Sequence, residues 1–184
     1  LISVSLDLLL RGIGSVPVVD GERKLVGIVT DTDLINAFLR ASWESKLGPD
    51  GDPSITDYTP DEVVSTGPET TIAAARELCR KHRIRHLPVV EGTRLVGLVS
   101  DRDLRWGQGR NVPDDEPVST LMSTVLRTVQ SEALCSHAAR MMTEFKVSCL
   151  PVVAGSELQS IVTTTDLLEH CGHTLWQIDS FNDS

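Results

Sequence analysis

Short apolar runs, each followed by a polar turn, recur along this chain in a fixed order. Within residues 84–103, an apolar run at 87–90 is followed by a turn that contains glycine and by a second apolar run at 95–99. Two such runs around a glycine turn are typical of a β-hairpin. Ser100 and Asp103 then stand at the spacing that caps the first turn of a helix. The stretch therefore predicts a strand, a turn, a second strand and the start of a helix.

The same pattern occurs twice more. The first copy has runs at 16–19 and 25–29 with the pair Thr30 and Asp33, and the third has runs at 150–153 and 158–162 with the pair Thr163 and Asp166. The spacing from the proline of the first strand to the aspartate of the pair is the same in the second and third copies. The first copy has one extra residue in its turn. A repeat that keeps the same spacing over three copies is stronger evidence for the fold than any single motif.

The second and third copies are longer than the first. Each opens with a short predicted strand, at 61–66 and 125–129, and continues with a segment whose apolar residues fall on one helical face. These faces consist of Ile72, Ala75, Leu78 and Cys79 in the second copy and of Cys135, Ala138, Met141 and Met142 in the third. The complete unit is therefore strand, helix, strand, strand, helix, which predicts an α/β fold. One unit buries too little apolar surface to be stable alone, so the units are expected to pack on one another.

The first copy is incomplete, because no opening strand precedes it. Residues 1–12 predict the end of a helix, and a helix led by Thr30 is expected to run to about Leu39. Residues 47–54 are dense in glycine, proline and aspartate and predict a linker. We therefore expect a partial repeat at 1–46, complete repeats at 55–108 and 117–170, and a tail at 171–184.

The connections predict which copies pair. The link between the second and third copies is short, whereas the link between the first and second is longer and contains the predicted linker. Short connections favour direct packing of neighbours. The second and third copies are therefore expected to form a pair. The first is expected to pair with an upstream repeat or with its own symmetry mate in a homodimer.

Composition and charge narrow the function. The chain of 184 residues is 40% hydrophobic and 23% charged, and its formal net charge of −9 disfavours a general nucleic-acid-binding protein. No apolar run is long enough to span a membrane. Four irregularly spaced cysteines predict reduced thiols in a cytoplasmic protein. No signal peptide is visible, and Leu1 is not a natural start, so an upstream segment is expected.

The repeat resembles the CBS domain, a family named after cystathionine β-synthase. The phrases that carry the resemblance are HRIRHLPVV at 82–90 and LVGLVSDRDL at 95–104, and the resemblance covers nearly the whole chain except the tail. It implies tandem repeats that pair with pseudo-two-fold symmetry in a Bateman module, dimerise, and regulate other proteins rather than act as enzymes. It also implies a regulatory ligand between paired repeats, AMP, ADP, ATP or S-adenosylmethionine, and no required cofactor.

The resemblance assigns roles to particular residues. In the family, the aspartate of the Ser/Thr-x-x-Asp motif binds the ribose with help from the motif's hydroxyl residue, the opening strand contacts adenine, and cations at the corner before the proline bind phosphate. The implied ligand-binding residues are Thr66, Ile84, Arg85, His86, Pro88, Ser100, Arg102 and Asp103 in the second copy, Thr163 and Asp166 in the third, and Thr30 and Asp33 in the first. A carboxylate suits ribose because it accepts charge-assisted hydrogen bonds from a vicinal diol. The alternative is that each motif is only a helix capping box, although a capped helix start is itself favourable for anions.

The three copies are not equivalent. Only the second has a basic corner, Arg85–His86, where the first has Gly14–Ser15 and the third has Ser148–Cys149. The third copy also has Ser160 where the second has Gly97, which weakens the expectation of a site there. The second copy is therefore expected to be the strongest site and to prefer phosphorylated ligands to adenosine. The alternative for the nearby cations is that they only complement the C-terminus of a helix; these cations are Arg80, Lys81 and Arg83.

The sequence contains few other candidates for metal-binding or catalytic residues. His170, Cys171 and His173 lie close together, but structural zinc needs four ligands in two spaced pairs, so a disordered tail without metal is expected. No phosphate-binding glycine loop, nucleophile elbow or zinc-protease motif occurs, so an enzyme is not expected. The alternative to a nucleotide-sensing module is a ligand-free dimerisation scaffold, in which the same residues are caps and surface charge.

Overall fold

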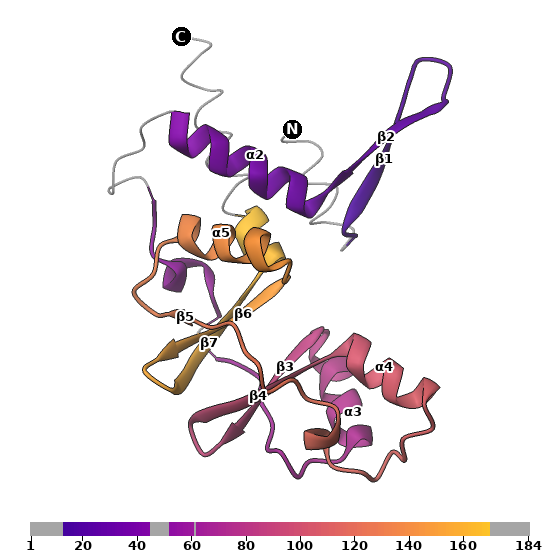
Figure 1. Cartoon of the computed structure of the whole chain (residues 1–184), viewed down its shortest axis with the longest axis vertical. Helices are drawn as coiled ribbons and strands as arrows, with labels where there is room; N and C mark the ends of the chain where they lie inside the picture. Colours follow the sequence, from indigo (N-terminus) through magenta and orange to yellow (C-terminus); the bar gives the residue numbers. More distant parts are fainter. Residues whose placement is uncertain (1–12, 45–51, 61, 170–184) are drawn as a thin grey trace. The chain divides into compact units, whose positions relative to one another are not determined.

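The computed structural model describes residues 13–44, 52–60 and 62–169, and Figure 1 shows a chain of short strands and helices. In chain order the elements are β1 (Ser15–Val19), β2 (Leu25–Thr30), α2 (Asp31–Glu44), η2 (Ile55–Tyr58), α3 (Ile72–His82), β3 (His86–Glu91), β4 (Arg94–Ser100), α4 (Asp101–Gly109), η3 (Val118–Thr120), β5 (Val129–Gln130), α5 (Cys135–Phe145), β6 (Cys149–Ala154) and β7 (Glu157–Thr163). Residues 164–169 are also helical. This order confirms the predicted α/β fold class.

The chain divides into two compact units. One contains Leu1–Thr59, Glu132–Leu150 and Val162–Ser184, and the other contains Pro60–Ser131 and Pro151–Ile161. Residues 62–108 of the second copy therefore lie within one unit, together with parts of β6 and β7 from the third copy. No helix among the described residues is long and apolar enough to cross a lipid bilayer.

The second copy packs its helices on one face of its hairpin. The core of this packing consists of Ile72, Ala75 and Cys79 from α3, Leu87, Val89 and Val99 from β3 and β4, Leu104 from α4, and Val118 from η3. Helix α3 begins where the Thr71 hydroxyl accepts a hydrogen bond from the N–H of Ala74 at 3.2 Å, and it ends at Arg83, whose φ of 55° is left-handed. The left-handed residue reverses the chain, so the predicted basic corner follows the helix directly. Lys146, with φ 53°, ends α5 in the same way.

The hairpins of the second and third copies belong to one five-stranded sheet of order β3-β4-β7-β6-β5. Where β4 meets β7, the N–H of Leu95 donates to the carbonyl of Ser156 at 3.1 Å, and the N–H of Leu158 donates to the carbonyl of Thr93 at 2.9 Å. Leu95 and Leu158 are equivalent positions of the repeat, as are Thr93 and Ser156. The two hydrogen bonds are therefore related by a local two-fold symmetry, as expected for a pair.

Short turns ahead of each copy confirm this reciprocity. In η3, the N–H of Val118 donates to the carbonyl of Thr70, just before α3, at 2.7 Å. In η2, the N–H of Ile55 donates to the carbonyl of Ala133, just before α5, at 2.9 Å. Ile55 and Val118 are equivalent, and both are fully buried. The turn that precedes each copy thus hydrogen-bonds just before the first helix of the other copy. This reciprocal contact agrees with the predicted pairing.

The opening strands are shorter than predicted. Of the described residues 62–66, only Thr66 pairs, as an isolated parallel bridge to Val89, and of 125–129 only Val129 is in a strand, which continues in β5. The pairing at Thr66 stops at once because a turn follows, in which the carbonyl of Gly67 accepts from the N–H of Thr70 at 3.2 Å.

Other predictions differ from the structure or fall outside its described part. Helix α2 continues past Leu39 to Glu44, since no glycine or proline interrupts it. The predicted helix at 1–12, most of the linker at 47–54 and the predicted tail at 171–184 lie outside the described residues.

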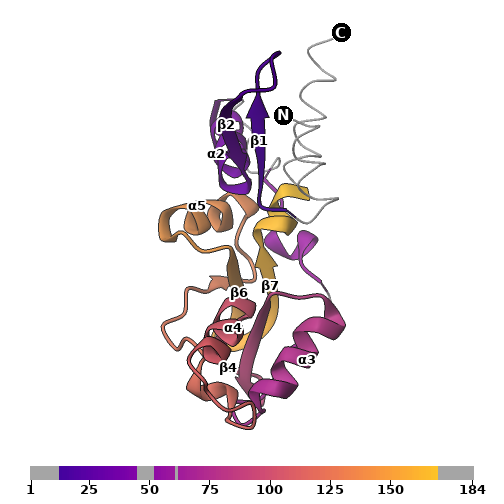
Figure 2. The same cartoon turned by 90° about the vertical axis from the view of Figure 1, so that its right-hand side faces the viewer.

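The first copy's hairpin forms a two-stranded sheet of its own. Figures 1 and 2 show β1 and β2 extending from the start of α2. Helix α2 itself is anchored in its unit by Leu34 and Ile35, which are 3% and 1% exposed. The hairpin therefore has regular strands but little cover.

Candidate functional site

Ser100 and Asp103 form a complete capping box at the start of α4. The N–H and the hydroxyl of Ser100 both donate to Oδ2 of Asp103, at 2.8 Å and 2.5 Å, and the N–H of Asp103 donates to the Ser100 hydroxyl at 3.3 Å. Because both bonds reach Oδ2, the other oxygen, Oδ1, accepts no hydrogen bond from the described residues. The cap therefore holds the carboxylate in place and leaves one oxygen for a ligand.

The other two motifs have the same local geometry. Oδ2 of Asp33 accepts from the N–H of Thr30 at 2.9 Å and from its hydroxyl at 2.7 Å. Oδ2 of Asp166 accepts from the N–H and the hydroxyl of Thr163, both at 2.7 Å. The capping box predicted as the alternative thus forms in the first and second copies, and in the third the carboxylate makes the same contacts to the residue before the helix.

A backbone hydrogen bond ties the corner to the motif in each copy. The N–H of Asp101 donates to the carbonyl of Arg85 at 2.9 Å. The equivalent bonds run from Asp31 to the Gly14 carbonyl at 3.1 Å and from Thr164 to the Ser148 carbonyl at 3.1 Å. The corner therefore lies beside the helix start in every copy, but only the second copy has a cation there.

The predicted residues of the second copy gather around this corner. Arg85 and Arg102 are exposed, and His86 is half-buried and lies opposite Ser100 in the β3–β4 ladder. Ile84 is half-buried at the same corner, whereas the side chain of Pro88 is buried within β3. The structure brings together Ser100, Asp103 and the basic corner, and it leaves Pro88 a packing position.

Thr66 does not offer the backbone contact that the sequence suggested. Its N–H donates to the carbonyl of Pro88 at 3.0 Å, and its carbonyl accepts from the N–H of Val90 at 2.8 Å. Alternate residues of an extended segment point to opposite sides. The neighbouring Ser65, whose backbone makes no hydrogen bond within the described residues, therefore has the groups directed away from β3. Sequence reasoning missed Ser65 because only the bridge to Val89 fixes which residues face outward.

The ionisable groups of the three copies are in different environments. Hydrogen bonds from Thr30 lower the pKa of Asp33, which is exposed. Burial raises the pKa of Asp166 despite its bonds to Thr163, and Glu169 raises it further. Burial lowers the pKa of His86, and the nearby charge of Arg85 lowers it further. An ionised carboxylate is therefore less favourable at Asp166 than at Asp33.

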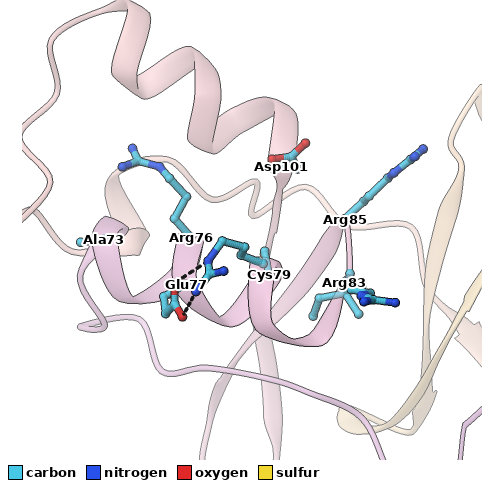
Figure 3. Close-up of a pocket in the computed structure, with 9 residues that line it drawn as sticks. Ala73, Arg76, Glu77, Cys79, Arg83, Arg85 and Asp101 are labelled. Carbon is cyan, nitrogen blue, oxygen red and sulfur yellow. Dashed lines mark hydrogen bonds and ion pairs between the residues drawn. The ribbon is translucent and has the colours of Figure 1, made fainter.

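A separate surface pocket of about 580 Å³ lies along α3 beside this corner, and Figure 3 shows its lining. Its residues are Ala73, Arg76, Glu77, Cys79, Arg80, Arg83, Ile84, Arg85 and Asp101. Two of its cations are already paired, Arg80 with Glu77 at 2.7 Å and Arg76 with Asp114 at 2.9 Å. In Figure 3, Arg85 extends away from α3 on the side of Asp101. The pocket includes Ile84 and Arg85 of the predicted site but neither Ser100 nor Asp103, so it adjoins the capping box without containing it.

The described residues contain no group of three or more histidine, cysteine or acidic side chains that could hold a metal ion. His170, Cys171 and His173 lie outside the described part of the chain. The three described cysteines, Cys79, Cys135 and Cys149, are buried free thiols, and burial raises their pKa values.

Paired strand–helix repeats with a capped Ser/Thr-x-x-Asp motif after each hairpin define the class of this protein. The chain belongs to the CBS domain family, which matches residues 2–40, 55–106 and 118–173. This finding confirms the resemblance that the sequence motifs carried.

Known proteins similar to the chain agree with this membership. The uncharacterized protein MJ1404 of Methanocaldococcus jannaschii is 31% identical over 179 residues, which cover 89% of this chain and 41% of that protein. The crystal structure of MJ1225 from the same organism aligns with a TM-score of 0.74 and 22% identity, covering 91% of this chain and 63% of that one. The CBS domain pair of protein MJ0100, solved in complex with 5′-methylthioadenosine and S-adenosyl-L-methionine, aligns with a TM-score of 0.62 and 23% identity over 67% of this chain and 98% of that one. The chain thus spans less than half of MJ1404 and less than two thirds of MJ1225.

Proposed function

We propose that this chain is a regulatory module, not an enzyme, that binds an adenosine-containing ligand at the second copy. The observation that carries the proposal is the fixed carboxylate of Asp103 at the helix start beside the Arg85–His86 corner, whose Oδ1 accepts no hydrogen bond within the described part of the chain. The adenosine-type ligands of the MJ0100 pair, a member of the same fold class, support the ligand class. AMP, ADP, ATP and S-adenosylmethionine are the candidates.

Each part of such a ligand has a matching group. Oδ1 of Asp103 accepts a ribose hydroxyl, while the Ser100 cap keeps the carboxylate from rotating. Arg85 and Arg102 are exposed and supply positive charge for phosphate. The base lies against the half-buried Ile84, with the outward backbone groups of Ser65 taking the role expected of Thr66. Because the corner is cationic, phosphorylated ligands should bind more tightly than adenosine.

The other two motifs are weaker candidates. Thr30 and Asp33 have the same geometry, but glycine and serine occupy their corner. The corner beside Thr163 and Asp166 likewise has no cation. Burial also raises the pKa of Asp166. Both motifs serve first as helix caps.

Calorimetric titration of the whole chain tests the proposal. Losing a charge-assisted hydrogen bond to a buried partner costs about 1.5–3 kcal/mol. Asp103→Ala should therefore weaken AMP or ATP binding about tenfold to a hundredfold. Arg85→Ala should weaken AMP to a similar degree and leave adenosine nearly unchanged.

Asp33→Ala is the matched control, because it removes the same capping carboxylate in a copy without a basic corner. It should leave nucleotide affinity unchanged. Equal losses for AMP and adenosine in Arg85→Ala would show a structural role for Arg85. If none of the four ligands bound, the proposal would be wrong, and the motifs would be helix caps only.

The second candidate function is a ligand-free dimerisation scaffold in the cytoplasm. It is favoured by the hydroxyl–carboxylate hydrogen bond of each motif, which forms without a ligand in all three copies. A thermal-shift series separates the two candidates, because a ligand that binds the native state raises the melting temperature as its concentration passes the dissociation constant. Sedimentation with and without AMP would show whether a homodimer forms through the repeats and whether it depends on ligand.

A further inference from the structure

The pocket along α3 concentrates positive charge on an acidic chain. Four of the residues that line it are arginines, and its lining contains two carboxylates, Glu77 and Asp101. The chain as a whole has a formal net charge of −9. A concave site lined by an excess of one charge attracts ligands of the opposite charge. We call this site the arginine pocket after its four arginines, Arg76, Arg80, Arg83 and Arg85.

The repeat does not need these arginines in order to fold. Helix α5 of the third copy is the equivalent of α3, and both helices end at a left-handed residue, Lys146 in one and Arg83 in the other. The last turn of α3 is basic, whereas the last turn of α5 contains no basic residue. Complementing a helix C-terminus therefore does not account for the whole set. The residues of the third copy at the positions of the four arginines are Ala139, Thr143, Lys146 and Ser148.

The guanidinium groups differ in how firmly they are held. Arg76 is 28% exposed, and its Nη1 donates to Oδ1 of Asp114 at 2.9 Å. Arg80 donates to both carboxylate oxygens of Glu77, at 2.9 Å and 2.7 Å, but the two side chains are 77% and 58% exposed. Exposed ion pairs contribute little to stability, so a ligand can replace Glu77 at small cost. The side chain of Arg83 is exposed and makes no hydrogen bond or ion pair with any described residue.

The arginine pocket lies on the other side of the α4 start from the capping box. Asp101 lines the pocket and Asp103 does not, although both are in the first turn of α4. Residues two apart in an α-helix lie about 200° apart around its axis, so these two carboxylates face opposite sides. Asp101 is also paired with Arg105 at 2.9 Å, which offsets its charge. Figure 3 shows Arg83 and Arg85 on one side of Cys79 and Arg76 on the other.

We propose that the arginine pocket is a second ligand site, which binds a small oxyanion with at least two negative charges. Guanidinium groups suit this chemistry because their N–H groups form paired hydrogen bonds with phosphate or carboxylate oxygens. The volume of about 580 Å³ is within the range of about 300–1,000 Å³ that is usual for small-molecule sites. Ala73, Cys79 and Ile84 give the lining an apolar part that suits a carbon skeleton. This site does not depend on the nucleotide proposed for the capping box.

Calorimetric titration of the full chain at low ionic strength tests the proposal, with pyrophosphate, citrate and acetate as probes. Pyrophosphate or citrate should bind saturably, and monovalent acetate should bind about tenfold more weakly or less. The tighter of the two polyvalent probes decides between phosphate and polycarboxylate ligands. The double variant Arg80→Gln/Arg83→Gln should weaken that probe about tenfold or more, because it removes two charged donors. Arg83→Gln alone, which breaks no contact among the described residues, should weaken it about threefold.

Lys81→Gln/Lys146→Gln is the matched control, because it removes two charges from exposed positions outside the pocket, one of them at the equivalent helix end. It should leave the affinity unchanged, and thermal melts should show that all variants remain folded. Asp103→Ala should not weaken the probe, so failure of the nucleotide proposal would leave this result intact.

Three results would overturn the proposal. The first is the absence of saturable binding of both polyvalent probes. The second is an equal loss in the lysine control, which would show a general effect of net charge. The third is a loss in Arg102→Gln without a loss in Arg80→Gln/Arg83→Gln, which would assign the anion to the corner beside the capping box.

Discussion

The β1–β2 and β3–β4 hairpins have nearly the same pattern of apolar residues, but their surroundings differ. Both are antiparallel with a register shift at the same place, between Val18 and Val19 in one and between Val89 and Val90 in the other. Val89 is fully buried, whereas its equivalent, Val18, is 40% exposed. The local pattern is sufficient to specify the strands, the turn and the capped helix start. The burial of Val89 comes from packing against α3 and α4.

The largest effect should come from a charge placed at equivalent positions of a covered and an uncovered hairpin. Val153, in β6, is 2% exposed, and its equivalent Val19, in β1, is 52% exposed. Val153→Asp should lower the free energy of unfolding by about 3 kcal/mol or more, because it buries an unpaired charge. Val19→Asp should change it by no more than about 0.5 kcal/mol. Urea unfolding of both variants measures the difference, and equal losses would mean that the first hairpin is covered in solution.

A smaller effect is expected at the glycines that occupy equivalent positions in β2 and β4. A Cβ added at Gly97 would lie 2.3 Å from Sδ and 2.9 Å from Cγ of Met122, whereas one added at Gly27 would meet only Val18 at 4.0 Å. Gly97→Ala should therefore destabilise the protein by about 1–3 kcal/mol through overpacking. Gly27→Ala should be neutral or slightly stabilising, since it restricts the unfolded chain. Thermal melts compare the two, and a similar loss for both would contradict the close approach of Met122.

Sequence alone could predict those features that are decided within one copy. The hairpins and the Ser100–Asp103 cap depend on residues close together in the chain, and the structure contains them. The length of the opening strands depends on pairing with β3 in the second copy and with β6 in the third, and the outward direction of Ser65 depends on the same pairing with β3, so no local pattern revealed them. Arg80 lies in the last turn of α3 and pairs with Glu77, a contact that the sequence analysis did not predict.

Ser160 illustrates the same limit at long range. In sequence, Ser160 differs from the glycine at the equivalent position of the other two copies. In the structure its hydroxyl donates to the carbonyl of Pro60 at 2.8 Å, and the residue is 5% exposed. Its equivalent Gly97 lies against Met122 instead. The third copy therefore uses a hydrogen bond where the second uses close packing, and a contact between residues so far apart in sequence has no signature in either segment.

Removing that hydrogen bond should have a moderate effect. Ser160→Ala should lower the free energy of unfolding by about 1 kcal/mol, because the Pro60 carbonyl loses its donor. Ser156→Ala, in the exposed turn before β7, is the control and should have almost no effect. Urea titration of the two variants measures both changes. A loss in Ser156→Ala as large as that in Ser160→Ala would show that the bond to Pro60 contributes nothing specific.

The smallest effect concerns pH and the corner that distinguishes the second copy from the first, where His86 stands in place of Ser15. Burial and the charge of Arg85 lower the pKa of His86 below its ordinary value of 6.5. The unfolded chain therefore takes up this proton at a higher pH than the folded chain. The stability that the neutral imidazole contributes is complete above pH 6.5 and is lost as pH falls from 6.5 toward the lowered folded value. The melting temperature should accordingly decrease on acidification through this range, and His86→Gln should reduce that decrease. His82→Gln, at the exposed end of α3, is the control. An unchanged pH dependence in His86→Gln would mean that other groups cause the acid sensitivity.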